Sequence, residues 1–255
     1  MIIVLKRMFS SYWSVLALVI LWQFSATVGS YNIIVMPSPA DVFFALLDNP
    51  KFFVLETSYT LGFSLAGLFF GMGLGSLVAV LAWSTPIFEG VLSPIAIMVR
   101  SIPIIAFIPI IVSLFGYGSG TILASVTVLI FFPCYVFLLS GLKQVETPQR
   151  ELSVILGSDS DIKGKWRFFY YLALPNAWPR LFTAFRILAP TSVLAVLVAE
   201  FLIGSNGLGY IISSARHQLD MGLSWLAALT ATIISVGLFM TASRLEELIF
   251  ERRFC

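Results

Sequence analysis

Charged side chains are scarce in this chain. Asp, Glu, Lys and Arg make up 11% of its 255 residues, whereas 59% of the residues are hydrophobic. Soluble domains carry about 25% charged residues, so the composition excludes an ordinary soluble enzyme or binding domain. A mean hydropathy of +0.98 indicates a polytopic membrane protein. The net charge of +2 is small and gives no reason to expect a nucleic-acid partner.

Histidine and cysteine are also rare. His217 is the single histidine, and the two cysteines are Cys134 and Cys255. These residues assemble neither a metal cluster nor a Cys-His nucleophile pair, and we expect no disulfide. Cys134 is most simply a small packing residue. No glycine-rich run is followed by the Lys-Ser/Thr pair of a nucleotide loop. We therefore expect a chain that is not an enzyme and holds no cofactor. An intramembrane enzyme is a distant alternative, because the apolar stretches contain few polar groups.

Six apolar stretches are long enough to cross about 30 Å of hydrocarbon. They cover residues 12–28, 58–82, 87–114, 120–142, 180–203 and 221–245. No composition shift or linker divides the chain. We expect one all-α transmembrane domain over residues 1–255 with six spans, so that both termini lie on the same side of the membrane.

The distribution of basic residues predicts the orientation. Only Lys51 and Arg216 fall on one side of the six-span arrangement. Eleven fall on the other side, at both ends of the chain and in or beside residues 143–179: Lys6, Arg7, Lys143, Arg150, Lys163, Lys165, Arg167, Arg180, Arg244, Arg252 and Arg253. The positive-inside rule therefore places both termini and the 143–179 loop in the cytosol. A cleavable signal peptide at the first span is an alternative, but the run ends without a clear small-x-small cleavage site.

Two local patterns predict structure around the second span. Ser38, Pro39 and Asp41 form a plausible start for a short helix in the proline-containing external segment. Glycines at positions 67, 71 and 75 recur every fourth residue within the span. Such a ridge of small residues lets another helix backbone approach closely, which is a main source of helix association in lipid.

The third span is the leading candidate for a translocation path. Pro94, Pro103 and Pro109 each remove a backbone donor, so they bend or break the helix. Broken helices at membrane depth occur where they line a protein interior or a cavity. Arg100 lies near the middle of this span and Glu200 lies toward the outer end of the fifth. The two form either a structural ion pair or, for an anionic solute, an attracting charge and its gate or counter-ion.

The loop over residues 143–179 reads as two short helices around Gly157. Thr147 and Pro148 start the first, and Gly157 can take the left-handed conformation that ends it. Ser158 and Asp161 have capping-box spacing for the second. An apolar stripe follows at Trp166, Phe169 and Tyr170. An amphipathic loop lying on the bilayer surface is the alternative interpretation.

Several blocks of this chain resemble one family. Glu151, Gly157 and Leu174-Pro175 look like the EAA loop of ABC importer permeases, with Leu152 and Ser153 where that family has alanines. Further blocks are similar, in order, to the branch that handles nitrate, sulfonates, taurine and bicarbonate: Arg100–Pro103, Ala106–Gly118, LPNAWP with Arg186, and Ala199–Tyr210. The resemblance spans residues 57–253.

The resemblance implies a permease subunit in a bacterial-type cytoplasmic membrane. It implies a homodimer with two ATPase subunits docked on the cytosolic loop, and ATP and Mg bound by those ATPase subunits. It also implies an external solute-binding protein and a small, anionic type of solute such as nitrate, a sulfonate, taurine or bicarbonate. The implied ATPase-coupling residues are Glu151, Leu152, Ile155, Leu156, Gly157, Ser158, Trp166 and Phe169, and the pathway residues are Arg100, Pro103, Pro109 and Glu200.

An ion-coupled secondary transporter that uses Arg100 and Glu200 is the alternative. It lacks the inverted repeat expected of such proteins and leaves the 143–179 loop without a use.

Overall fold

The protein is helical throughout the part that its computed structural model describes, residues 2–29, 34–101, 103–144 and 162–254. The first half holds α1 (Ile2–Val28), α2 (Pro39–Asp48), α3 (Pro50–Ser84), α4 (Pro86–Ser101), α5 (Ile104–Phe115) and α6 (Ser119–Lys143). The second half holds α8 (Ile162–Phe168), the π-helical segment η1 (Phe169–Ala173), α9 (Leu174–Ile203), α10 (Leu208–His217) and α11 (Met221–Phe254).

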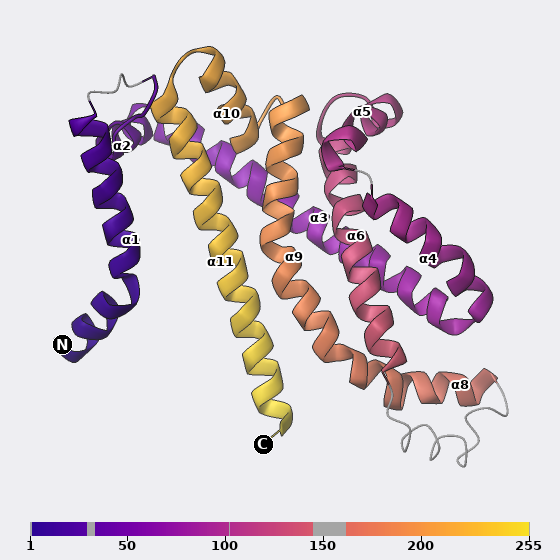
Figure 1. Ribbon diagram of the computed structural model, residues 1–255. Helices are drawn as coiled ribbons and strands as arrows, with labels where there is room; N and C mark the ends of the chain where they lie inside the picture. Colours follow the sequence, from indigo (N-terminus) through magenta and orange to yellow (C-terminus); the bar gives the residue numbers. More distant parts are fainter. Residues whose placement is uncertain (1, 30–33, 102, 145–161, 255) are drawn as a thin grey trace.

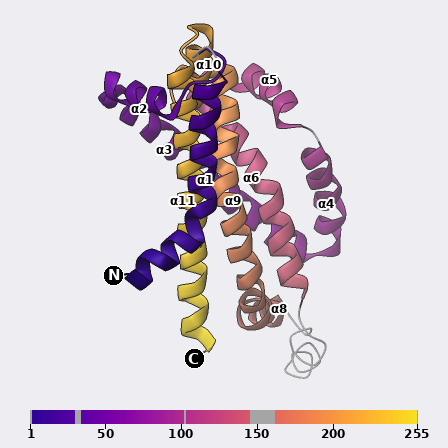
Figure 2. The same ribbon diagram turned by 60° about the vertical axis from the view of Figure 1, so that its left-hand side comes forward.

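Four of the described helices are long and apolar enough to cross a membrane: those over Pro50–Ser84, Ser119–Lys143, Lys163–Ile203 and Met221–Ile249. Shorter apolar helices cover Leu16–Val28, Pro86–Met98 and Ile105–Phe115. The helices α2, α5 and α10 gather at one end of the bundle, and α8 lies at the other end, near the C-terminus (Figures 1 and 2). The predicted all-α class is confirmed for the described residues.

The glycine ridge of α3 packs against α6, as its spacing predicts. A Cβ atom added at Gly71 would lie 2.6 Å from Ile130 Cβ, and one at Gly75 would lie 2.6 Å from the carbonyl oxygen of Phe131. Real Cβ atoms do not come this close, so only glycine permits the observed approach of the two backbones. Close approach increases dispersion contacts, which hold helices together where lipid removes the hydrophobic driving force.

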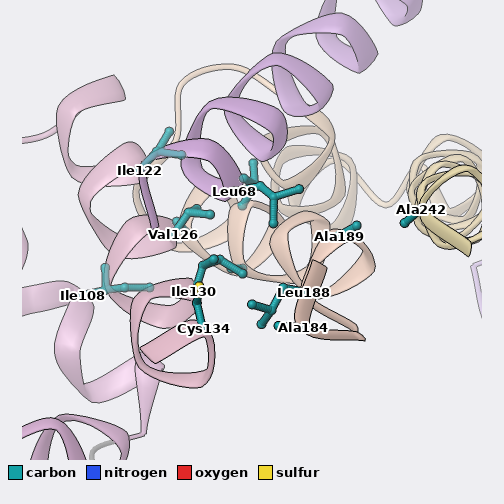
Figure 3. Packing of buried hydrophobic residues seen from close by; sticks show 13 residues of the cluster. Leu68, Ile108, Ile122, Val126, Ile130, Cys134, Ala184, Leu188, Ala189 and Ala242 are labelled. Carbon is teal, nitrogen blue, oxygen red and sulfur yellow. The ribbon is translucent and has the colours of Figure 1, made fainter. Parts of the chain in front are cut away.

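The core lies where α3, α6 and α9 meet. Figure 3 shows Leu68 of α3, Val126 and Ile130 of α6 and Leu188 of α9 in one cluster. Cys134 joins the same cluster, fully buried, with its thiol 3.4 Å from the Met72 carbonyl. Its expected role as a packing residue agrees with this position.

The third predicted span is broken rather than continuous. Helix α4 ends at Ser101 and α5 begins at Ile104, with Pro103 at the N-cap position of α5. The Pro103 carbonyl accepts from the N–H groups of Ala106 and Phe107, at 2.9 and 3.2 Å. Proline has no N–H to continue the preceding helix, so the break falls beside it. Pro94 and Pro109 lie inside α4 and α5 without interrupting them.

The short helix after the first predicted span is present as its start signal predicts. Helix α2 begins at Pro39 with Ser38 as N-cap. The Ser38 N–H donates to Asp41 Oδ2 at 2.7 Å, and the Asp41 N–H donates to Ser38 Oγ at 3.3 Å, which completes a capping box. Beside it, the indole of Trp22 in α1 donates to the Pro37 carbonyl at 2.9 Å and stacks on Trp225 of α11. This end of the bundle therefore holds α1 in place.

The connection between the last two predicted spans contains a helix that the sequence analysis does not predict. Residues 208–217, which include Arg216 and His217, form α10.

Glycine packing gives the first test. Gly71→Ala forces a methyl group into α6 and should destabilise the fold by about 1–3 kcal/mol. Gly73→Ala is the matched control, because a Cβ at Gly73 meets nothing within 4 Å. It should be neutral or should stabilise the helix by up to about 1 kcal/mol. Thermal unfolding of the purified protein in detergent measures both, and equal melting temperatures for the two variants would refute the packing account.

Candidate functional site

A buried polar cluster joins α3 to the turn between α9 and α10. Glu200, near the end of α9, is 0% exposed. Thr60 of α3 donates its hydroxyl to the Glu200 carboxylate, with Oγ1 lying 3.0 Å from Oε1 and 2.8 Å from Oε2. Glu56, one turn earlier on α3, is also buried. Thus two carboxylates and a hydroxyl meet at one end of the bundle.

The cluster satisfies the N-terminus of α10. The Leu208 N–H donates to Thr60 Oγ1 at 2.8 Å, and the Gly209 N–H donates to Glu200 Oε2 at 3.0 Å. Glu56 accepts from the Gly207 N–H. The first N–H groups of a helix have no partner within the helix, and the helix dipole favours negative charge there. The carboxylates and α10 therefore stabilise each other, which explains why residues 208–217 are helical.

Glycine is required at two positions of this turn. Gly207 has φ +96°, a conformation that side chains disfavour, and a Cβ there would collide with the Glu200 carboxylate. A Cβ at Gly209 would lie 2.6 Å from Glu200 Cβ. The absence of side chains at these two glycines thus lets their backbone N–H groups approach the carboxylates of Glu56 and Glu200 within hydrogen-bonding distance.

The predicted pathway residues occupy different environments. Glu200 is enclosed and hydrogen-bonded, so its described contacts hold α10 to α3. Pro103 and Pro109 are exposed on α5. Arg100 lies in the last turn of α4, and its side chain lies outside the described part of the chain.

Helix α5 has one covered face and one open face. Ile108 and Ile111 are buried, whereas Ile105, Ile110 and Leu114 are more than half exposed. The open face adjoins the break at Pro103. An apolar face of this kind either meets lipid or meets another protein surface.

The opposite end of the bundle carries a platform made of α8 and η1. Phe168 and Phe169 lie against Trp83 at the end of α3, with ring centroids 6.3 and 5.2 Å apart. Lys165 Nζ donates to the Ser84 carbonyl. The Leu174 N–H donates to the Phe169 carbonyl, a π-type bond, and Pro175 follows without an N–H of its own. Such π segments are frequent at functional sites.

The predicted ATPase-coupling residues are only partly described. Glu151, Leu152, Ile155, Leu156, Gly157 and Ser158 lie outside the described residues, so the helix-Gly-helix arrangement stays a prediction. Trp166 is 45% exposed and available to a partner. Phe169 is 5% exposed and packs inside the protein, so it positions the platform rather than forming its outer surface.

One ion pair was missed by the sequence interpretation. The Nη1 atom of Arg186 in α9 lies 2.9 Å from Oε2 of Glu246 in α11. Thr183 Oγ1 donates to the other oxygen of Glu246 at 3.5 Å. The two residues are 60 positions apart, and no local pattern pairs them. The ion pair joins α9 to the C-terminal part of α11.

No group of His, Cys, Asp and Glu within the described ranges could hold a metal ion. His217 lines a pocket of about 260 Å³ with Phe201, Ser213 and Arg216 at the α10 end. This set offers no nucleophile paired with a base.

These features define an integral membrane protein built from apolar helices, with a proline-broken helix, and with capped short helices at one end and an aromatic platform at the other. Residues 71–254 match the family described as "Binding-protein-dependent transport system inner membrane component", and the chain belongs to this family.

Homologous proteins with assigned names agree with this family assignment. The chain is 30% identical to a "Probable ABC transporter permease protein" of Haemophilus influenzae, over 88% of this chain and 89% of that one. It is 28% identical to the formylaminopyrimidine transport permease protein ThiX of Halalkalibacterium halodurans, with 93% of each chain covered. It is 26% identical to the taurine transport system permease protein TauC of Escherichia coli, over 89% and 85%.

A solved structure supports the fold. The chain superposes on the MetNI methionine ABC transporter in an inward-facing conformation with a TM-score of 0.66 and 22% identity. The match covers 78% of this chain and 96% of that one. The family match and the 30% identical relative confirm the predicted family, and the chain belongs to the permease components of ABC transporters, which are non-catalytic.

The buried cluster gives the second test. Thr60→Val keeps the shape but leaves the Leu208 N–H without its acceptor and leaves the Glu200 carboxylate with the Gly209 N–H alone of these two donors, so we expect a loss of about 1–3 kcal/mol. Thr57→Val is the control, because the Thr57 hydroxyl bonds only to a carbonyl of its own helix, that of Phe53 at 2.8 Å. Thermal unfolding and proteolysis within residues 204–207 are the measurements. Equal behaviour of the two variants would show that the cluster does not hold α10.

Proposed function

We propose that this chain is the permease subunit of an ATP-driven ABC importer and forms the translocation path for a small solute. The family match carries the proposal, because residues 71–254 include the broken α4–α5 segment, the platform and the α9–α10 turn. The relatives that name a cargo are transport permeases.

The proposed topology has six spans. Helices α4 and α5 together make one crossing, interrupted at Pro103, and α1 makes the first. Both termini and the 143–179 loop then lie in the cytosol, where the positive-inside rule places their basic residues. The ends holding α2 and α10 face outward. This arrangement suits a multi-pass protein of a bacterial-type cytoplasmic membrane.

Two copies of the chain form the path between them. The open face of α5, beside the helix break, supports this proposal because it leaves apolar surface next to irregular backbone at membrane depth. A separate solute-binding protein delivers the solute at the outer end, near α10. Arg100 and the exposed prolines Pro103 and Pro109 are the proposed pathway residues, and Glu200 holds the outer end of the path in place.

Two ATPase subunits bind the cytosolic loop and carry ATP and Mg. Their closure moves the loop, and the movement reaches α9 through α8 and η1. The chain continuity of α8, η1 and α9 supports this route. The contacts of Phe168 and Phe169 with Trp83, together with the bond from Lys165 to Ser84, also join the platform to α3, so the movement reaches α3 as well. The proposed docking residues are Glu151, Leu152, Ile155, Leu156, Gly157, Ser158 and Trp166, with the buried Phe169 supporting them from within the platform.

The proposed solute is small and carries an anionic group, as nitrate, sulfonates, taurine and bicarbonate do. Arg100 supports this class, because a cation in a span normally has a partner or a role. The name of ThiX points to a different solute, a formylaminopyrimidine. Taurine and formylaminopyrimidine are therefore the two probes that separate the classes.

Topology gives the third test. In a background with Cys134 and Cys255 replaced by serine, Lys165→Cys should be inaccessible to an impermeant maleimide in intact cells, whereas Arg216→Cys should label. Both should label after lysis. External labelling of Lys165→Cys would place the platform outside and remove the proposed ATPase site.

Transport gives the fourth test. In vesicles containing the permease with its ATPase and binding protein, uptake should require ATP. Arg100→Gln should lower uptake of an anion by about tenfold, the size expected for one charge-assisted contact. Arg100→Lys should recover part of it, because the charge persists.

Co-purification of the ATPase should be unchanged in both variants. Uptake by the permease alone, driven by an ion gradient, would support the secondary transporter instead. Full uptake by Arg100→Gln would remove Arg100 from the path.

A further inference from the structure

The platform has two chemically different faces. Its inner face holds Lys165, Phe168 and Phe169, which contact Ser84 and Trp83 of α3. Its outer face, here called the α8 outer face, holds Lys163, Arg167, Tyr170 and Tyr171. All four are exposed, and the two tyrosines are 61% and 78% exposed. Basic and aromatic side chains are thus displayed together, away from the core.

The two cations of this face lie one helical turn apart. Residues at i and i+4 are neighbours on a helix surface, and like charges there repel each other. Neither Lys163 nor Arg167 forms an ion pair within the part of the chain that the structure describes, whereas Lys143 pairs with Glu89 and Arg186 pairs with Glu246. An external anion would relieve this repulsion.

The position of the platform indicates which anion. In Figures 1 and 2, α8 runs across the inner end of the bundle, transverse to α6 and α9. It lies where the apolar helix α6 ends at Lys143 and where α9 begins at Leu174. This depth corresponds to the headgroup layer if α6 and α9 cross the membrane. Tyrosine and tryptophan rings are enriched in that layer, and the negative surface of the inner leaflet attracts lysine and arginine.

We propose that the α8 outer face binds the headgroups of anionic phospholipids in the cytosolic leaflet. The proposal rests on the topology given above. Tyrosine rings are favoured where one end meets apolar groups and the other meets water, and neighbouring cations are favoured beside phosphate, so a lipid headgroup region suits both kinds of side chain. Among the proposed ATPase docking residues the structure describes Trp166, which borders the α8 outer face and is not one of its four residues. The lipid holds α8 at headgroup depth directly before η1, the segment that leads into α9.

Trp166 serves as the probe for this contact. It is partly exposed, and its ring centroid lies 6.1 Å from that of Tyr170. The full-length protein is placed in vesicles of phosphatidylcholine and phosphatidylglycerol in which only one of the two lipids carries brominated acyl chains. The quenching of Trp166 is obtained by subtracting the quenched fluorescence of the Trp166→Phe variant from that of the unaltered protein. Comparing the two labelling schemes gives the preference for the anionic lipid at this face.

We expect the share of Trp166 quenching that comes from brominated phosphatidylglycerol to exceed the mole fraction of phosphatidylglycerol in the vesicle. The double variant Lys163→Gln/Arg167→Gln should lower this preference by about fivefold or more, since each basic residue near an anionic surface contributes about that factor. The control Lys51→Gln/Arg216→Gln removes the same charge from the opposite end and should keep the preference. Equal melting temperatures would show that both double variants are folded.

If each lipid quenches Trp166 of the unaltered protein in proportion to its mole fraction, the proposal is overturned. An equal loss of the phosphatidylglycerol preference in both double variants would also overturn it. Absence of quenching by either lipid would place α8 away from the bilayer and overturn it as well. Maleimide labelling of Lys165→Cys tests the topology independently, so failure of the lipid contact is distinguishable from failure of the proposed function. Loss of quenching when the ATPase binds would assign this face to the ATPase.

Discussion

The close approach of α3 to α6 is the contact on which the rest of the structure depends. Lipid offers no hydrophobic driving force between helices, so association relies on tight packing of backbone and side chains. Gly71 and Gly75 allow it, because any Cβ there would collide with α6. Helix α9 then packs on α6 and closes the core around Val126, Ile130 and Leu188. Without this contact neither end of the bundle would have a fixed support.

Helix α3 links the two ends. Its 35 residues span about 52 Å at 1.5 Å per residue. Glu56 and Thr60 near its start hold the turn before α10, and Trp83 and Ser84 at its end hold the platform. Helix α3 therefore contacts both α10, which is proposed to face the binding protein, and the platform of α8 and η1, which is proposed to face the ATPase. This arrangement suits a transporter, in which events at the two membrane surfaces must be coupled.

Most charged groups described within the helices have structural partners. Glu200 and Glu56 accept from the N-terminus of α10, and Arg186 pairs with Glu246 between α9 and α11. Leaving the buried Glu56 or Glu200 without partners would destabilise the fold by several kcal/mol. The Arg186–Glu246 pair is partly exposed and contributes less. The partners of these charged groups make them parts of the framework, which leaves Arg100 and the open face of α5 as the candidates for contact with the solute.

The sequence by itself determined the features that depend on neighbouring residues: the apolar lengths of the long helices, the Ser38–Asp41 capping box, the break at Pro103 and the glycine spacing on α3. Each is set within a few residues, so it is readable locally. The tertiary structure decided the rest. Helix α10 forms because Glu56 and Thr60, about 150 positions earlier, accept its N–H groups. Phe169 is buried by Trp83, and Glu246 pairs with Arg186, across similarly non-local contacts. No local pattern encodes partners so distant along the chain, because the fold alone brings them within hydrogen-bonding distance.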